Sequence, residues 1–100
     1  MTNVYFRRLN ETVAGIAAYA GRRYEEAAAH FEEALRQAAA FPIVLEGAEV
    51  RRFFAAMLTE RDTDGDRERA RQLLEEALET YRSIGTVRHA ELAEQQLKSL

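Results

Sequence analysis

The stretch GRRYEEAAAHFEEALRQAAAFP, from Gly21 to Pro42, has a counterpart in DRERARQLLEEALETYRSIG, from Asp66 to Gly85. Apolar residues recur in both stretches at helical spacing, and each equivalent pair is separated by 43 positions. The equivalent positions are Tyr24, Ala27, Phe31, Ala34 and Leu35 in the first stretch, and Arg67, Ala70, Leu74, Ala77 and Leu78 in the second. Each stretch is therefore predicted to be the second helix of a helical hairpin, and the hairpin occurs twice.

The composition of the chain favours helices throughout. Alanine, leucine, glutamate and arginine are strong helix formers and dominate the sequence, which only one proline and five glycines interrupt. The 100 residues predict one domain, 1–100, of the all-α class, built from antiparallel helical hairpins. The predicted helices span about 3–19, 23–40, 42–61, 67–83 and 87–99.

Small residues stand where neighbouring helices are expected to touch. The alanines of the two stretches allow helix axes to approach closely, while the larger Phe31 and Leu74 fill the adjacent grooves. If Thr63–Gly65 are an insertion of three residues, the period is 40 and Gly15 falls opposite Ala55. Such a period, with two helices per unit, is typical of a helical repeat array.

The sequence also assigns helix faces and helix ends. The predicted apolar face of helix 3–19 comprises Phe6, Leu9, Val13, Ile16, Ala17 and Ala20. The predicted face of helix 42–61 includes Leu45, Val50, Phe53, Phe54, Met57 and Leu58, and that of helix 67–83 extends to Ile84. Asp66 is expected to cap the start of helix 67–83, and Gly85 is expected to end it in the left-handed conformation.

One motif resembles a known family, the tetratricopeptide repeat. The motif comprises Tyr24-Glu-Glu-Ala27, Phe31 and the pair Ala34-Leu35, with the small Gly15 upstream. The resemblance covers about Asn3 to Gly85, and it departs from the family at Arg67, where the family prefers tyrosine. It implies about two repeats and a C-terminal capping helix, stacked as a right-handed superhelix.

The second half of the chain indicates which form of the repeat the sequence resembles. LLEEALETYRSIGTVRHAELAE, from Leu73 to Glu94, is similar to the end of the long-repeat arrays that follow ATPase cores in bacterial signalling proteins. The resemblance therefore implies a non-enzymatic scaffold that binds a peptide or a helix of a partner, as part of a signalling or transcription-regulatory protein. In such arrays the first helix of each pair lines the groove. The implied groove residues are Leu9, Thr12, Ile16, Tyr19, Glu49, Arg52, Ala56 and Thr59.

Self-association is the alternative interpretation. An array is usually stable only with about three repeats; if this chain is a fragment of a longer array, its first helix has lost a neighbour. An apolar patch that includes Tyr5, Phe6 and Leu9 is then expected to pair with another copy.

The charge and hydropathy patterns argue against nucleic acid and membrane partners. The net charge is −3, and glutamates interleave with the arginine pairs, whereas a nucleic-acid-binding domain is usually basic. The longest apolar run, Val13 to Ala20, is far shorter than the roughly 20 residues that span a bilayer. We expect a cytoplasmic protein.

No pattern in the sequence indicates catalysis, a metal or a cofactor. The loop DTDGD, Asp62 to Asp66, fails as a calcium loop because the sixth and twelfth places hold Arg67 and Leu73. His30 and His89 each lack a second histidine at i+4, and there is no cysteine. The many glutamates match the solvated faces of amphipathic helices. We therefore expect no enzymatic activity.

Overall fold

The computed structural model describes the backbone of residues 4–40 and 44–100 and the side chains of residues 11–37 and 45–100. The described chain forms five helices and no strand, which confirms the all-α prediction. The helices are α1 (Val4–Ala20), α2 (Tyr24–Ala40), α3 (Val44–Arg61), α4 (Asp66–Ile84) and α5 (Val87–Lys98). Their bounds lie within one or two residues of the predicted ones. The predicted starts at 3 and 42 fall outside the described residues.

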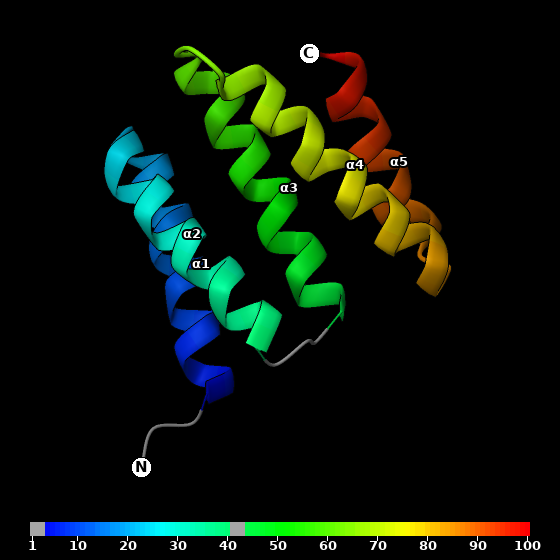
Figure 1. Ribbon diagram of the computed structural model, residues 1–100, viewed down its shortest axis with the longest axis horizontal. Helices are drawn as coiled ribbons and strands as arrows, with labels where there is room; N and C mark the ends of the chain where they lie inside the picture. Colours follow the sequence, from blue (N-terminus) through cyan, green and yellow to red (C-terminus); the bar gives the residue numbers. More distant parts are fainter. Residues whose placement is uncertain (1–3, 41–43) are drawn as a thin grey trace.

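The helices pack in chain order, each against the next. In Figure 1, α2 and α4 lie in front, while α1 and α5 lie behind them. Contacts across the stack agree with this view, because Arg69 of α4 pairs with Glu32 of α2 at 3.2 Å. On the other side, Gln96 of α5 donates a hydrogen bond to the Arg52 carbonyl of α3 at 3.3 Å. The odd-numbered helices therefore share one side, and α2 and α4 share the other.

The core is built from the small residues predicted at the helix contacts. The side chains of the four predicted contact alanines, Ala27, Ala34, Ala70 and Ala77, are fully buried, and so is that of Ala55. The larger Phe31 and Leu74 are buried beside them, and the Phe31 ring stacks on Phe54 of α3 with 5.5 Å between ring centroids. Because α2 and α4 bury equivalent positions, the repeat read from the sequence is also a repeat of core packing.

The offset of 43 positions continues beyond these two helices. Val50 and Phe54 of α3 are buried in the core. Ala93, 43 positions after Val50, is also buried, and Leu97, 43 positions after Phe54, packs against the same core. The pair α4–α5 thus repeats the packing of the pair α2–α3.

The predicted apolar face of α1 is wrong at Val13, Ala17 and Ala20, whereas Ile16 packs against the core as predicted. The Val13 side chain is 55% exposed, and Ala17 and Ala20 are exposed as well. The buried residues of this part are Thr12, Gly15 and Ala18. Because α1 and α2 pack closely, small residues such as Gly15 and Ala18 are buried at their contact, while the more apolar Val13 is exposed. Phe6 and Leu9 lie outside the described side chains.

Two further residues of the predicted faces are exposed. The exposed fraction is 42% for Leu45 and 47% for Ile84. Leu45 lies in the first turn of α3 and Ile84 is the last residue of α4, so both lie at helix ends, where neighbouring helices cover less of the side chain.

The predicted cap at Asp66 is also wrong. Gly65, with a φ of 83°, occupies the N-cap position of α4. The buried Asp66 carboxylate turns back into the loop, where it accepts hydrogen bonds from the Thr63 backbone N–H at 3.0 Å and the Thr63 hydroxyl at 2.7 Å. Arg61 donates two more, from Nε at 2.8 Å and Nη2 at 2.9 Å. The Arg61 guanidinium holds the pKa of Asp66 well below its usual range.

The predicted cap at Gly85 is confirmed. Gly85 has a φ of 79° and ends α4 in the left-handed conformation. The next residue, Thr86, donates its backbone N–H to the Tyr81 carbonyl at 3.0 Å, which satisfies an end carbonyl of the helix. The turn directs the chain into α5.

Candidate peptide-binding groove

Residues from α1, α3 and α5 line a groove of about 300 Å³ on the side of the stack that these helices share. The lining residues are Tyr19, Ala56, Thr59, Glu60, Gln96 and Ser99. They come from the last turn of α1, the second half of α3 and the C-terminal end of α5 and the residue after it. Three separate segments of the chain therefore meet at this groove.

The walls of the groove offer an aromatic ring, a carboxylate and small polar groups. Burial raises the pKa of the Tyr19 phenol, and the charge of the neighbouring Glu60 and a hydrogen bond to it add to the rise. The Thr59 hydroxyl donates to the Ala55 carbonyl at 2.8 Å, so its hydrogen is already engaged. Ala56 leaves space in the wall. The arrangement suits binding by shape and polar contacts.

The structure brings three of the predicted groove residues together, namely Tyr19, Ala56 and Thr59. Ile16 is half-buried and packs against the core, and Thr12 is only 9% exposed. Leu9 lies outside the described side chains. Three of the predicted residues therefore line this groove, while other predicted residues lie in the packing beside it.

The predicted residues Glu49 and Arg52 belong to a different cluster, at the contact of α3, α4 and α5. Arg52 Nη2 donates to Glu49 Oε2 at 2.8 Å, and the fully buried Tyr81 donates its hydroxyl to Glu49 Oε1 at 3.1 Å. His89 Nε2 lies 3.0 Å from the same Oε1, and its Nδ1 lies 2.7 Å from Thr86 Oγ1. Glu49 therefore joins three helices through its carboxylate.

The sequence analysis missed three lining residues, Glu60, Gln96 and Ser99. The spacing of two of them relative to the predicted residue Ala56 indicates a place in the groove. Glu60 follows Ala56 by four positions, so both lie on one stripe of α3. Ser99 follows Ala56 by 43 positions, the same offset that relates the two repeat stretches. The last helix was predicted only as a capping helix, so its residues were not predicted to line the groove.

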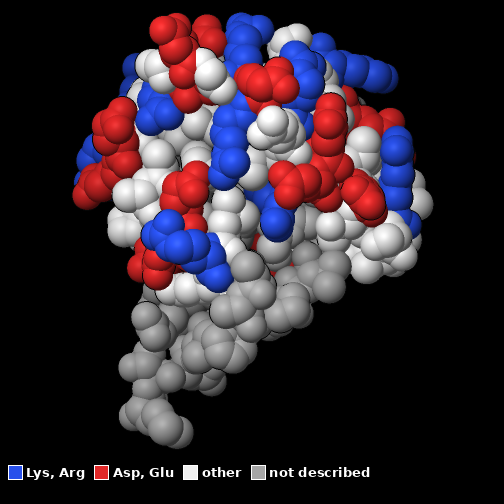
Figure 2. All heavy atoms as spheres, in the orientation of Figure 1, with Lys and Arg blue, Asp and Glu red and all other residues white. Residues whose placement is uncertain are grey.

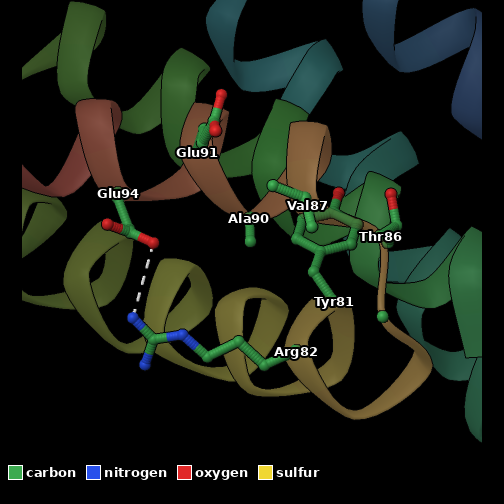
Figure 3. Close-up of a pocket in the computed structure, with 8 residues that line it drawn as sticks. Tyr81, Arg82, Thr86, Val87, Ala90, Glu91 and Glu94 are labelled. Atoms are coloured by element: carbon green, nitrogen blue, oxygen red, sulfur yellow. Dashed lines mark hydrogen bonds and ion pairs between the residues drawn. The ribbon is translucent and has the colours of Figure 1, made fainter.

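A second groove, of about 460 Å³, lies between the end of α4 and the start of α5 (Figure 3). The Tyr81 ring points from α4 towards Val87 and Thr86. Arg82 and Glu94 reach towards each other with 3.4 Å between Nη2 and Oε1. This ion pair joins the two helices that form the groove.

His30 lies at the contact between α1 and α2. His30 is half-buried, and its Nδ1 lies 2.8 Å from Glu11 Oε2 of α1, so it joins α1 to α2. His30 therefore contributes to a contact between two helices.

The described residues contain no group of three or more histidine, cysteine, aspartate or glutamate side chains that could hold a metal ion. Among the same residues, no helix is both long enough and apolar enough to cross a membrane. On the face shown in Figure 2, cationic and anionic side chains are interspersed rather than gathered by sign. This face therefore shows no single-sign field of the kind that attracts nucleic acid.

A family model for the C-terminal part of far upstream element-binding proteins matches residues 78–99, which run from the end of α4 through α5. The match is limited to this segment. A search of curated proteins and a search of solved structures found no match to the chain.

Proposed function

We propose that the protein is a non-enzymatic scaffold that binds a peptide or a helix of a partner protein in the groove between α1, α3 and α5. The observation that carries the proposal is the meeting of Tyr19, Ala56 and Ser99, one residue from each of three chain segments, around one hollow. A hollow that combines one aromatic ring with several polar side chains offers a bound segment both contact area and groups that fix its orientation. The mechanism is binding by shape and polar anchors, with no covalent step.

The repeated packing supports the same proposal. Equivalent core positions in α2 and α4 place successive hairpins at a constant offset, which is how a repeat array builds an extended binding surface. A right-handed superhelical stack, as in the tetratricopeptide family, is part of the proposal. A role in a bacterial signalling or transcription-regulatory protein in the cytoplasm is also part of the proposal.

Selection from a random peptide library displayed on phage tests the proposed function. Peptides selected on the full chain are synthesised with a fluorophore, and their binding is measured by fluorescence anisotropy. Two variants block the groove by different routes. Ala56→Phe fills its wall from α3, and Ser99→Trp fills it from the C-terminal end. We expect each to weaken binding at least about tenfold, because a bound segment has no room beside the new ring.

The matched control is Ala29→Phe, which adds the same ring at an exposed position of α2, outside the groove. It should leave peptide binding unchanged. Circular dichroism shows whether each variant is still folded. If the selected peptides bind Ala56→Phe and Ser99→Trp as they bind the unchanged chain, the groove is not the binding site.

Self-association is a second candidate, favoured by the exposed apolar side of α1. Val13 is 55% exposed, and the exposed Ala17 lies one turn further along the same helix. We propose that this side, together with Tyr5, Phe6 and Leu9, pairs with a second copy. Multi-angle light scattering tests the pairing. A Val13→Glu variant should shift a dimer towards monomer, and a strict monomer at high concentration of the unchanged chain would contradict this candidate.

A further inference from the structure

Glu60 differs from the better-paired carboxylates of the structure in having no cationic partner among the described side chains. Asp66 binds Arg61 at 2.8 Å, and Glu49 binds Arg52 at 2.8 Å. Glu60 forms no ion pair with any described residue, although it lies on α3 between these two pairs in the sequence. Its described polar neighbour is the Tyr19 phenol. The groove therefore contains a carboxylate whose charge is not neutralised.

No cationic side chain lines the groove to compensate this charge. The lining consists of one carboxylate and five uncharged residues. Arg61, the next residue after Glu60, is engaged by Asp66 and by Glu25. Lys98 precedes the lining Ser99, but it is exposed and forms no ion pair with a described residue. A ligand that enters the groove meets a net negative charge.

Tyr19 adds an aromatic ring beside this charge. Its phenol lies beside the Glu60 carboxylate in the lining of the groove. An aromatic face attracts an organic cation, and a carboxylate pairs with a guanidinium through two parallel hydrogen bonds. A planar guanidinium can satisfy both groups at once, because its flat face stacks on the ring while its N–H groups donate within its own plane.

We propose that the groove receives an arginine side chain of the partner's bound segment, with Glu60 as its counter-charge and Tyr19 as the ring against which it lies. This inference rests on the proposed function and specifies the chemistry of the partner. Ala56 leaves space for the aliphatic part of the side chain. Gln96 and Ser99 already donate to the Arg52 and Gln95 carbonyls, so their side-chain oxygens are left to accept hydrogen bonds from the partner's backbone N–H groups.

The test uses small probes that reproduce side chains without a peptide. Propylguanidinium, butylammonium and the neutral butyramide are titrated into the ¹⁵N-labelled full chain, and amide shifts are followed by NMR. We expect saturable shifts at Tyr19, Ala56 and Glu60 with propylguanidinium, weaker binding of butylammonium, and no saturable shift with butyramide. Glu60→Gln keeps the shape of the side chain and removes the charge. It should weaken propylguanidinium binding by about threefold or more, in the range of an exposed ion pair.

The control variant is Glu79→Gln, at an exposed glutamate of α4 that forms no ion pair with a described residue and lies outside the groove. It changes the net charge as Glu60→Gln does, so it separates a local contact from general attraction. Equal weakening by both variants, or equal binding of propylguanidinium and butyramide, would overturn the inference.

The peptides selected for the proposed function provide an independent readout. Enrichment of arginine among groove-binding peptides, lost when selection is repeated on Glu60→Gln, supports the inference. If the selected peptides bind the groove without enrichment of arginine, the inference about arginine is wrong, but the proposed scaffold function is still supported. If no selected peptide depends on the groove, the scaffold function itself fails, whatever the small probes show.

Discussion

The ring of Phe31 lies directly against Gly15, so closely that a Cβ atom on Gly15 would come within 2.7 Å of Phe31 Cε1. The Phe31 side chain is fully buried and also stacks on Phe54, with ring centroids 5.5 Å apart. Because α2 holds this ring between α1 and α3, it cannot move away from Gly15 without disturbing the other contact. The absence of a side chain at position 15 therefore sets how closely α1 approaches α2.

Gly15→Ala is expected to lower the free energy of unfolding. Overpacking of a core by one methyl group typically costs about 1–3 kcal/mol, and the higher helix propensity of alanine returns at most about 1 kcal/mol. Urea denaturation followed by circular dichroism measures the difference. Ala17→Leu, on the exposed side of the same helix, is the control and should be nearly neutral. A more stable Gly15→Ala variant would show that the ring shifts freely.

The repeated alanines should respond alike to enlargement. Ala27→Leu in α2 and Ala77→Leu in α4 each place extra atoms at a fully buried position, so each should lower the free energy of unfolding by about 1–3 kcal/mol. Ala29→Leu, at an exposed position of α2, controls for the substitution itself. Thermal melts compare the three variants. Unchanged melting of both core variants would contradict the packing described for the repeat.

The sequence predicted the helices and the alanine contacts because both follow from local spacing. The face of α1 could not be predicted in the same way. Val13 is more apolar than Gly15, yet Gly15 is buried because the depth of the contact is set by Phe31, a residue of another helix. Apolar spacing reports which residues can be buried, while the fit between two helices decides which ones are.

The groove was only partly predictable for a related reason. Tyr19, Ala56 and Thr59 follow from the resemblance and lie together in the structure. Glu49 and Arg52 have equally suitable positions in the sequence, but they bind each other at 2.8 Å. A charged residue next to a groove helix is available to a partner only when no residue of its own chain engages it, and that depends on the three-dimensional contacts.

Asp66 should make stability depend on pH in the acid range. Its pKa is lowered in the folded chain, chiefly by Arg61, so its contribution is present above the ordinary aspartate pKa of about 3.9 and is lost as the pH falls below it. Asp66→Asn should lower the free energy of unfolding at pH 7 by roughly 1.5–3 kcal/mol, the range for hydrogen bonds to charged groups. The difference from the unchanged chain should shrink between about pH 5 and pH 2.

Urea denaturation at several pH values measures this difference. Asp64→Asn, in the same loop but exposed and without an ion pair to a described residue, is the matched control and should follow the unchanged chain at every pH. A constant difference for Asp66→Asn down to pH 2 would mean that the Arg61 contact does not lower the pKa of Asp66.

Tyr81 should have the opposite effect in the alkaline range. Burial raises the pKa of its phenol to about 12, with Glu49 adding to the rise and Arg52 opposing it. The folded chain therefore keeps this proton where the unfolded chain loses it. Because of Tyr81, the free energy of unfolding should decrease by roughly 1 kcal/mol as the pH rises from 10 to 11. The stability of Tyr81→Phe should fall less steeply over this range, as melting temperatures at each pH would show. The stability of the control Tyr24→Phe should fall as steeply as that of the unchanged chain.

Arg52→Ala is expected to destabilise the fold, although the family resemblance predicts a role for this residue in partner binding. Its guanidinium donates to Glu49 at 2.8 Å and lies over the Phe53 ring, 4.7 Å from the centroid. Removal leaves the Glu49 carboxylate with Tyr81 and His89 alone, and the loss of one charge-assisted hydrogen bond costs about 1.5–3 kcal/mol. Arg88→Ala, at an exposed position of α5, is the control. If urea denaturation finds Arg52→Ala as stable as Arg88→Ala, the Glu49 contact contributes little, and the guanidinium is then free to bind a partner.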